Sequence, residues 1–346
     1  EANRPQIDAD GLAPLYQIKQ QEPRWNVTNP ARQPQIQIEN SFNQAAQALI
    51  DQFVQTSPIH ANSLIVTVYG DTVCPYGGSI WLGSLIKLVK PLGVNERLVR
   101  TCVFRLSEKN LLRSQQIGRR SFYSLTEKGL RQFSSAARRI YAPDLASWDG
   151  QWRLVITLLG ELSIEQREQL RKELFWLGFT HITTGIFAHP TADLAEVSAL
   201  IKELQIEEHV AILQATTPEP ENVPVANRLI RNCFNTAALD EEYTEFNQQF
   251  APVLDAALNT RQPDPELCFL IKILLIHKYR RILLREPELP KELGEADSAS
   301  QQARRITAQL YGAIAAFADE YFKQVSESEK GAFAQPPRAY YRRFKN

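Results

Sequence analysis

The sequence predicts an α+β protein with several domains, and three observations support this fold class. The chain has 346 residues, more than one ordinary hydrophobic core organises, so we expect two or three domains. Residues 95–109 repeat apolar side chains with a helical period, whereas residues 152–214 alternate between strand-like and helix-like segments. Beyond residue 225 the pattern is helical throughout. The expected units are an extended arm at 1–40, an α+β unit at 41–142, an α/β unit at 148–216 and an all-α unit at 225–346.

Residues 80–125 carry the order of elements on which the functional interpretation depends. A short helix from Ser79, a turn containing Pro91 and Gly93, a second helix from Asn95 and then a hairpin are expected. This order is typical of a winged helix-turn-helix, whose second helix enters the DNA major groove. Residues 41–142 are therefore predicted to form a DNA-binding domain. Residues 63–69, taken alone, fit either a strand or a helix.

The second helix of this segment combines an apolar stripe with a basic face. Asn95 is suited to cap its start, because its side chain can accept a hydrogen bond from a backbone N–H one turn later. Leu98, Cys102 and Leu106 recur every four residues, which predicts an inward stripe together with Val99 and Val103. The polar residues off this stripe are Arg97, Arg100, Thr101 and Arg105. Arginine can bind guanine or a phosphate with its planar guanidinium group.

The hairpin that follows places more positive charge at an exposed tip. Arg119 and Arg120 follow Gly118, a position suited to phosphate or minor-groove contacts, and Ile117, Phe122 and Leu125 are expected to anchor the strands. Residues 95–140 contain eleven Lys and Arg against three Glu, a local balance of 11 − 3 = +8 in a chain of net charge zero. The alternative is that these side chains form only a solvated surface. The predicted DNA-binding residues are Asn95, Arg97, Arg100, Thr101, Arg105, Arg119, Arg120 and Ser121.

The middle and C-terminal units have simpler patterns. Residues 152–214 give the order β-α-β-β-α-β, which is that of a ferredoxin-like domain, with Ser163 and Gln166 suited to a capping box. Small nucleases also use this fold, but residues 152–159 contain no carboxylate to hold a metal ion. Long helices are expected at 239–258, 266–285 and 298–324, in a unit that would carry dimer contacts.

Several segments together resemble the PaaX-type repressors of phenylacetic acid degradation. The segments that carry the resemblance are Tyr69-Gly70-Asp71, Gly77-Gly78-Ser79-Ile80-Trp81-Leu82-Gly83-Ser84-Leu85, residues 97–106, residues 117–125, Trp148-Asp149-Gly150-Gln151-Trp152, residues 174–179 and His277-Lys278-Tyr279-Arg280-Arg281. The resemblance implies a bacterial repressor that binds double-stranded operator DNA and is released by an aryl-acetyl coenzyme A thioester, typically phenylacetyl-CoA. In place of the tryptophan usual after Leu-Pro-x-Glu-Leu, this chain has Gly294-Glu295-Ala296-Asp297-Ser298 following Leu293.

A coenzyme A thioester needs cations for its phosphates and an apolar slot for its aryl group. His277, Arg281 and Arg285 recur every four residues and therefore share one helix face. The predicted effector-binding residues are His277, Tyr279, Arg280, Arg281, Arg285, Tyr243 and Trp176. The alternative is that the arginines form salt bridges to Glu241, Glu242, Glu286 or Glu288, and that the aromatic residues belong to the core.

The sequence excludes several other classes of function. It contains no nucleophile–base motif, phosphate-binding loop or pair of histidines at metal-ligand spacing, so no catalytic residue, metal or cofactor is predicted. The four cysteines are far apart, as in a reduced cytoplasmic protein, and no apolar run reaches the roughly 20 residues that span a bilayer. We expect a cytoplasmic homodimeric repressor without a secretory signal. The competing hypotheses are an acyl-CoA-handling enzyme that carries a DNA-binding module, and a binding adaptor without a ligand.

Overall fold

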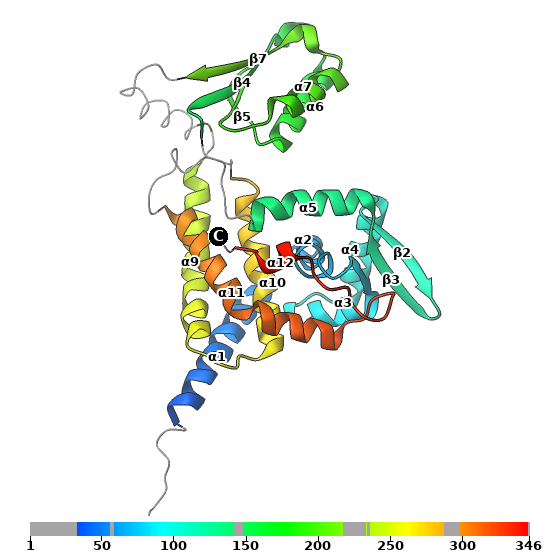
Figure 1. The fold of residues 1–346 in the computed structure, drawn as a ribbon, viewed down its shortest axis with the longest axis vertical. Helices are drawn as coiled ribbons and strands as arrows, with labels where there is room; N and C mark the ends of the chain where they lie inside the picture. Colours follow the sequence, from blue (N-terminus) through cyan, green and yellow to red (C-terminus); the bar gives the residue numbers. More distant parts are fainter. Residues whose placement is uncertain are drawn as a thin grey trace, which may run out of the picture.

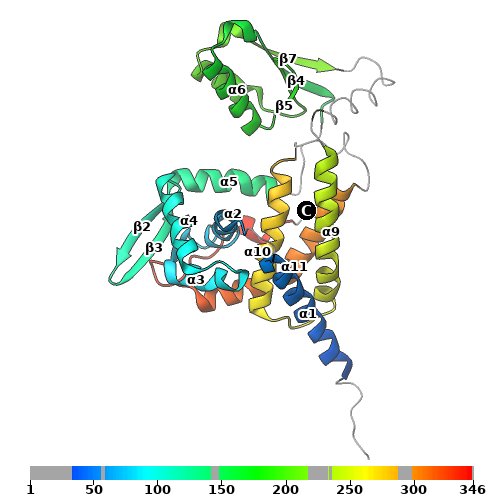
Figure 2. The ribbon, with the colours of Figure 1, turned by 180° about the vertical axis from the view of Figure 1, so that it is seen from behind.

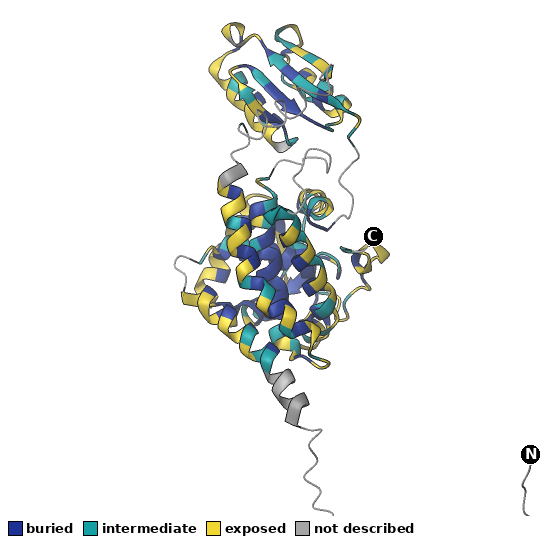
Figure 3. Cartoon of the chain, turned by 90° about the vertical axis from the view of Figure 1, so that its left-hand side faces the viewer, coloured by how far each residue is buried: buried dark blue, intermediate teal, exposed yellow. Residues whose placement is uncertain are grey.

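The computed structural model describes residues 33–55, 59–141, 148–216, 233, 236–286 and 298–344. Its ribbon falls into two parts, a small one that contains β4 to β7 with α6 and α7, and a large one that contains the other labelled elements (Figure 1). Buried residues gather inside the large part, whereas the outer faces of its helices are exposed (Figure 3). No helix in the described ranges is long and apolar enough to cross a membrane.

The large part has one continuous hydrophobic core that includes residues from both ends of the chain. At its centre lies α10 (Pro265–Leu283), which Asp264 caps by accepting a hydrogen bond from the Leu267 N–H at 2.9 Å. Helices α9 (Thr236–Leu258) and α11 (Ala299–Val325) pack along α10, and the short α12 (Arg338–Tyr341) follows. The predicted helical C-terminal region is confirmed, although α12 was not expected.

Helix α1 (Gln33–Gln55) packs mainly against α9 and α10 and also contacts the short turn at residues 90–92 (Figure 2). Its Phe42, Leu49 and Phe53 are buried in the shared core. The prediction of an extended arm through residue 40 is wrong for residues 33–40, which are helical, and residues 1–32 lie outside the described part of the chain. The helical period of residues 41–55 had shown an apolar face but not the helices that cover it.

Residues 61–141 form the basic elements, which follow in the order that the sequence predicts except that a short strand precedes α3 (Leu82–Val89). They are α2 (Ala61–Val68), the π-helix η1 (Tyr69–Val73), β1 (Ser79–Trp81), α3 (Leu82–Val89), the 3-10 turn η2 (Lys90–Leu92), α4 (Glu96–Glu108), β2 (Leu112–Ile117), β3 (Arg120–Leu125) and α5 (Glu127–Tyr141). Residues 63–68 are therefore helical. The helix expected from Ser79 begins only at Leu82, because the three residues before it pair with β3 in a sheet ordered β1-β3-β2. Gly93, with a φ of 78°, makes the left-handed turn into α4.

The small part has the predicted ferredoxin-like order. It consists of β4 (Gln151–Thr157), α6 (Ile164–Trp176), β5 (Thr180–Thr183), β6 (Ile186–His189), α7 (Leu194–Glu203) and β7 (Val210–Thr216). The strands form an antiparallel sheet in the order β5-β6-β4-β7. Ser163 and Gln166 form the predicted capping box at the start of α6. Val155 and Phe187 of the sheet pack with Leu170, Leu174 and Val197 of the two helices in a separate core.

Candidate nucleic-acid interface

Helix α4 is fixed by a buried face and presents a basic face outward. The Asn95 side chain accepts a hydrogen bond from the Leu98 N–H at 2.9 Å, which confirms the predicted cap. The buried side chains are Val99, Cys102, Val103 and Leu106. Leu98 was expected in this stripe, but it is 36% exposed, so that prediction is wrong. The narrower stripe centres on Val99 and Cys102 and leaves Arg97, Thr101 and Arg105 exposed on the other side of the helix.

Arg100 lies on the same outer surface and forms an ion pair with Glu96. Its Nε and Nη2 donate to one carboxylate oxygen of Glu96 at 2.9 and 2.7 Å. The two side chains are 59% and 58% exposed, and an ion pair one helical turn apart in solvent contributes only about 0.3–0.5 kcal/mol. A phosphate or a guanine could therefore replace Glu96 at small cost.

The β2–β3 hairpin projects from the same unit. Ile117 pairs with Arg120, so that Gly118 and Arg119 form a two-residue turn, in which Gly118 has a φ of 60°. Arg119 is exposed at this tip, and no ion pair is formed by it within the described residues. Phe122 is buried as an anchor and Leu125 partly so. The expectation that Ile117 is an anchor is wrong, because it is 43% exposed at the far end of β2.

Arg120 is held by a segment more than 200 residues later in the chain. It pairs with Glu327, and its guanidinium lies 4.6 Å from the centre of the Trp81 ring. The Trp81 N–H donates to the Glu327 carbonyl at 2.8 Å, and the Glu327 N–H donates to the Ser84 hydroxyl at 3.1 Å. The Ser124 hydroxyl donates to Glu329 at 3.0 Å. This acidic segment on the hairpin was not found from the sequence, because no local pattern links it to Arg120.

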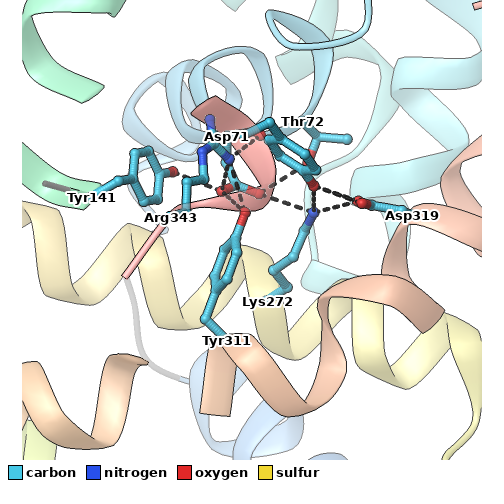
Figure 4. A network of polar contacts seen from close by, with 8 residues as sticks. Asp71, Thr72, Tyr141, Lys272, Tyr311, Asp319 and Arg343 are labelled. Carbon is cyan, nitrogen blue, oxygen red and sulfur yellow. Dashed lines mark hydrogen bonds and ion pairs between the residues drawn. The ribbon is translucent and has the colours of Figure 1, made fainter. Parts of the chain in front are cut away.

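A buried ionic network, which the sequence also did not reveal, joins Asp71 to Lys272 and Arg343 (Figure 4). Asp71, in η1, lies 3.3 Å from the Lys272 ammonium and 3.1 Å from the Arg343 guanidinium, and it accepts a hydrogen bond from the Tyr141 hydroxyl at 2.7 Å. Lys272 also donates to Asp319 at 2.8 Å. Burial alone would raise the pKa of Asp71, but Lys272 and Arg343 hold that pKa below its usual range.

This network joins distant parts of the chain. It connects η1 to α10 through Lys272, to α11 through Asp319 and to the segment after α12 through Arg343. Its two carboxylates and two cations balance, as buried charges require. The elements that carry the basic face are therefore attached to the C-terminal helices by charge as well as by the shared core.

Two of the predicted effector residues on α10, His277 and Arg280, lie against α2. Arg280 donates from Nε to the Thr67 hydroxyl at 2.8 Å and from Nη2 to the Ser63 carbonyl at 2.7 Å. His277 is buried beside Thr67, with Nδ1 3.3 Å from the hydroxyl. Burial, together with the neighbouring Arg280 and Arg281, lowers the pKa of His277 to about 3, so its ring is neutral at physiological pH.

The other predicted effector residues are dispersed. Arg285 pairs with Glu242, as the salt-bridge alternative expected, and Tyr279 is a core residue that contacts Phe246. The Tyr243 hydroxyl donates to Glu286. Arg281 is exposed on α10, whereas Trp176 belongs to α6 in the small part of the molecule.

An open cleft of about 650 Å³ lies elsewhere, at the surface of α6 near the end of α10. Its lining residues are Glu168, Gln169, Arg171, Lys172, Glu173, Phe175 and Leu284. The six predicted effector residues whose side chains the structure describes, His277, Tyr279, Arg280, Arg281, Arg285 and Tyr243, are not among them. Within the described residues no cluster of side chains suits a metal ion, and the four cysteines are free.

Comparison with known proteins identifies the family. Three family models match in sequence order: PaaX-like protein at residues 60–129, the PaaX central Cas2-like domain at 145–226 and the PaaX-like C-terminal domain at 234–324. The transcriptional repressor PaaX of Escherichia coli K12 is 35% identical over 301 residues, which cover 85% of this chain and 94% of that protein. The chain belongs to the PaaX family. Among solved structures, the uncharacterised protein Rv0674 from Mycobacterium tuberculosis matches with a TM-score of 0.45 and 20% identity, over 69% of this chain and 89% of that one.

Proposed function

We propose that this PaaX-family protein is a transcriptional repressor of a phenylacetate catabolic operon, and that it binds operator DNA through α4 and the β2–β3 hairpin. In this proposal α3, η2, α4 and the hairpin act as a winged helix-turn-helix, with α4 in the major groove and Arg119 on the backbone or in the minor groove. The observation that carries the proposal is the outward basic face of α4, which stands on a buried stripe and beside an exposed arginine at the hairpin tip.

We infer a DNA-binding domain at 41–142, a middle domain at 148–216 and a helical domain at 225–346 that supports a cytoplasmic homodimer. A symmetric dimer would bind two half-sites one helical turn, or a multiple of it, apart. The match over nearly the whole length of a transcriptional repressor supports a regulator rather than an enzyme.

We further propose that an aryl-acyl-CoA, phenylacetyl-CoA in the first instance, releases the DNA. The family supports this ligand class, and the cations of α10 remain the proposed contacts for its phosphates. Because Arg280 holds Ser63 and Thr67 of α2, a ligand that draws Arg280 away would loosen the attachment of α2. Such a ligand would shift the population of conformations only as far as it prefers one of them.

The salt dependence of DNA binding tests the first proposal. Fluorescence anisotropy would measure the affinity for a promoter fragment of the operon at several salt concentrations. Arg100→Ala and the double variant Arg119→Ala, Arg120→Ala should weaken binding, and each lost phosphate contact should reduce the slope of log K against log salt by about 0.9. Arg171→Ala is the matched control, because Arg171 is an exposed arginine on α6 in an ion pair with Glu168. Equal affinities and slopes for all four proteins would contradict the proposal.

The effector proposal has its own experiment. Phenylacetyl-CoA added to the DNA complex should lower the anisotropy, whereas free coenzyme A and phenylacetate should not. In thermal unfolding, a ligand at 100 times its Kd should add about 2.7 kcal/mol. A ligand that neither releases DNA nor raises the melting temperature would remove the effector proposal and leave DNA binding intact.

A further inference from the structure

Phe104 is the most exposed large apolar side chain on α4. It is 61% exposed, although the helix buries Val99, Cys102, Val103 and Leu106 in the core. Phe104 therefore contributes little to folding. Single exposed apolar residues are common on protein surfaces, so exposure alone has no functional meaning. The role of Phe104 depends on the side chains that surround it.

The residues around Phe104 are those of the basic face. On a helix, side chains three, four and seven positions apart share a side, which places Phe104 with Arg97, Arg100 and Thr101 toward the start of α4 and with Ser107 and Glu108 toward its end. Arg97, Arg100 and Thr101 are all exposed, and the Phe104 side chain leans toward them because helical side chains point toward the N-terminus. If the same face of a second copy packed here, the arginines of the two copies would meet, and their like charges would repel. A polyanion would instead pair with the arginines and cover the aromatic ring between them.

The chemistry of the major groove identifies what the ring could contact. Each base pair shows donors and acceptors there, and only thymine adds an apolar group, its C5-methyl. Helical side chains also lean toward the N-terminus of their helix, so Phe104 extends over the turn that carries Arg100. An aromatic ring beside a guanidinium can thus contact a thymine methyl next to a base or phosphate held by arginine.

We propose that Phe104 is a specificity-determining residue that recognises thymine in the operator by packing against its C5-methyl group. This inference rests on the proposed DNA-binding function and adds a preference for thymine that the arginines alone do not give. Arginine selects guanine or phosphate, whereas the ring distinguishes thymine from cytosine and also from uracil, which lacks the methyl.

Replacing thymine by deoxyuridine removes only the methyl group from the DNA. The operator is first selected from random-sequence DNA by the wild-type protein and is then made with either dTTP or dUTP. Wild-type protein should bind the uracil form more weakly, by about fourfold for each contacted methyl, the loss expected for one buried CH₂-sized group. Phe104→Ala should bind the thymine form more weakly than wild type does, and should bind its thymine and uracil forms equally. Since Phe104 is outside the core, this variant should fold normally.

Leu98→Ala provides the matched control. Leu98 is a less exposed apolar residue on α4, at 36%, and its truncation should keep the wild-type ratio of thymine to uracil affinity. An equal ratio in wild type and Phe104→Ala, or a selected operator that needs no thymine, would overturn the inference. The inference would also be overturned if Phe104→Ala no longer sedimented as a dimer but kept the wild-type ratio of thymine to uracil affinity. Phe104 would then be a contact between two subunits. If wild type selects no sequence at all, the proposed DNA-binding function itself fails.

Discussion

Lys272 gives the most informative test of the buried network. Its ammonium group lies 3.3 Å from Asp71 and 2.8 Å from Asp319, with the Tyr340 hydroxyl at 3.2 Å, and the Lys272 side chain is fully buried. Lys272→Met keeps the length of the side chain but removes its charge. Two carboxylates then remain with Arg343 alone, which leaves a buried net charge of −1. Breaking a buried ion pair in this way costs about 3–5 kcal/mol.

The assay is urea and thermal unfolding of both proteins at pH 7 and pH 5. At about 2–4 °C for each kcal/mol, the variant should melt about 6–20 °C below wild type at pH 7. In wild type the lowered pKa of Asp71 contributes stability that is present above its unfolded value of about 3.9 and is lost as the pH falls through the folded value. In the variant, which lacks Lys272, the pKa of the Asp71 carboxylate should rise, so that the carboxylate is more readily protonated at pH 5. The difference in stability between the variant and wild type should therefore be smaller at pH 5 than at pH 7.

Lys278→Met is the matched control on the same helix. Lys278 is partly buried and donates to the Gln249 side chain at 2.6 Å, a single hydrogen bond rather than an ionic network. Its loss should cost about 1–3 kcal/mol at most and should not depend on pH in this range. A loss below about 1 kcal/mol in Lys272→Met, or a loss of the same size at pH 7 and pH 5, would refute the ionic account of the network.

Glu327, His277 and Arg285 each offer a further test of a contact seen in the structure. Glu327→Gln frees Arg120 from its ion pair and should strengthen operator binding severalfold, with a steeper salt slope in the anisotropy assay; unchanged affinity would show that the pair does not compete with DNA. His277→Gln should flatten the pH dependence of the free energy of unfolding between pH 6.5 and 4. The lowered pKa of His277 contributes stability that is present above its unfolded value of about 6.5 and is lost, by at most about 1.4 kcal/mol for each pH unit, as the pH falls toward 3. Urea titrations in which the variant and wild type have the same slope against pH would contradict this. Arg285→Ala should change the free energy of unfolding by less than about 1 kcal/mol, since its ion pair with Glu242 is exposed, and a larger change in the same titrations would indicate a further role.

The elements predicted most closely are those that local chemistry determines. Asn95 caps α4, and Ser163 with Gln166 caps α6, because each forms its bonds within three residues. The strand and helix order of the middle domain was likewise apparent from its alternating patterns and is found in the sheet order. The apolar period also gave the buried side of α4, apart from Leu98 at its edge.

Contacts between distant segments could not be predicted in the same way. Strand β1 exists only because β3 pairs with it, so the sequence alone predicts a helix from Ser79. The ion-pair partners of Asp71 and of Arg120 come from segments 200 or more residues away, and a single sequence contains no signal of those pairs. The spacing of His277 and Arg281 showed a shared helix face, but not that Thr67 of α2 would lie against His277 and Arg280.

These long-range contacts all bear on the orientation of the basic face. Asp71 fixes the π-helix that precedes β1, and Glu327 fixes Trp81 at the start of α3. Arg280 fixes α2, which itself packs against α4. Three sites on the C-terminal helices and tail therefore hold three successive points of the region that is proposed to bind DNA. If that region reads DNA as proposed, its angle to a partner subunit is set by the helical core, and a ligand that acts on α10 would need no contact with the DNA to change the affinity for it.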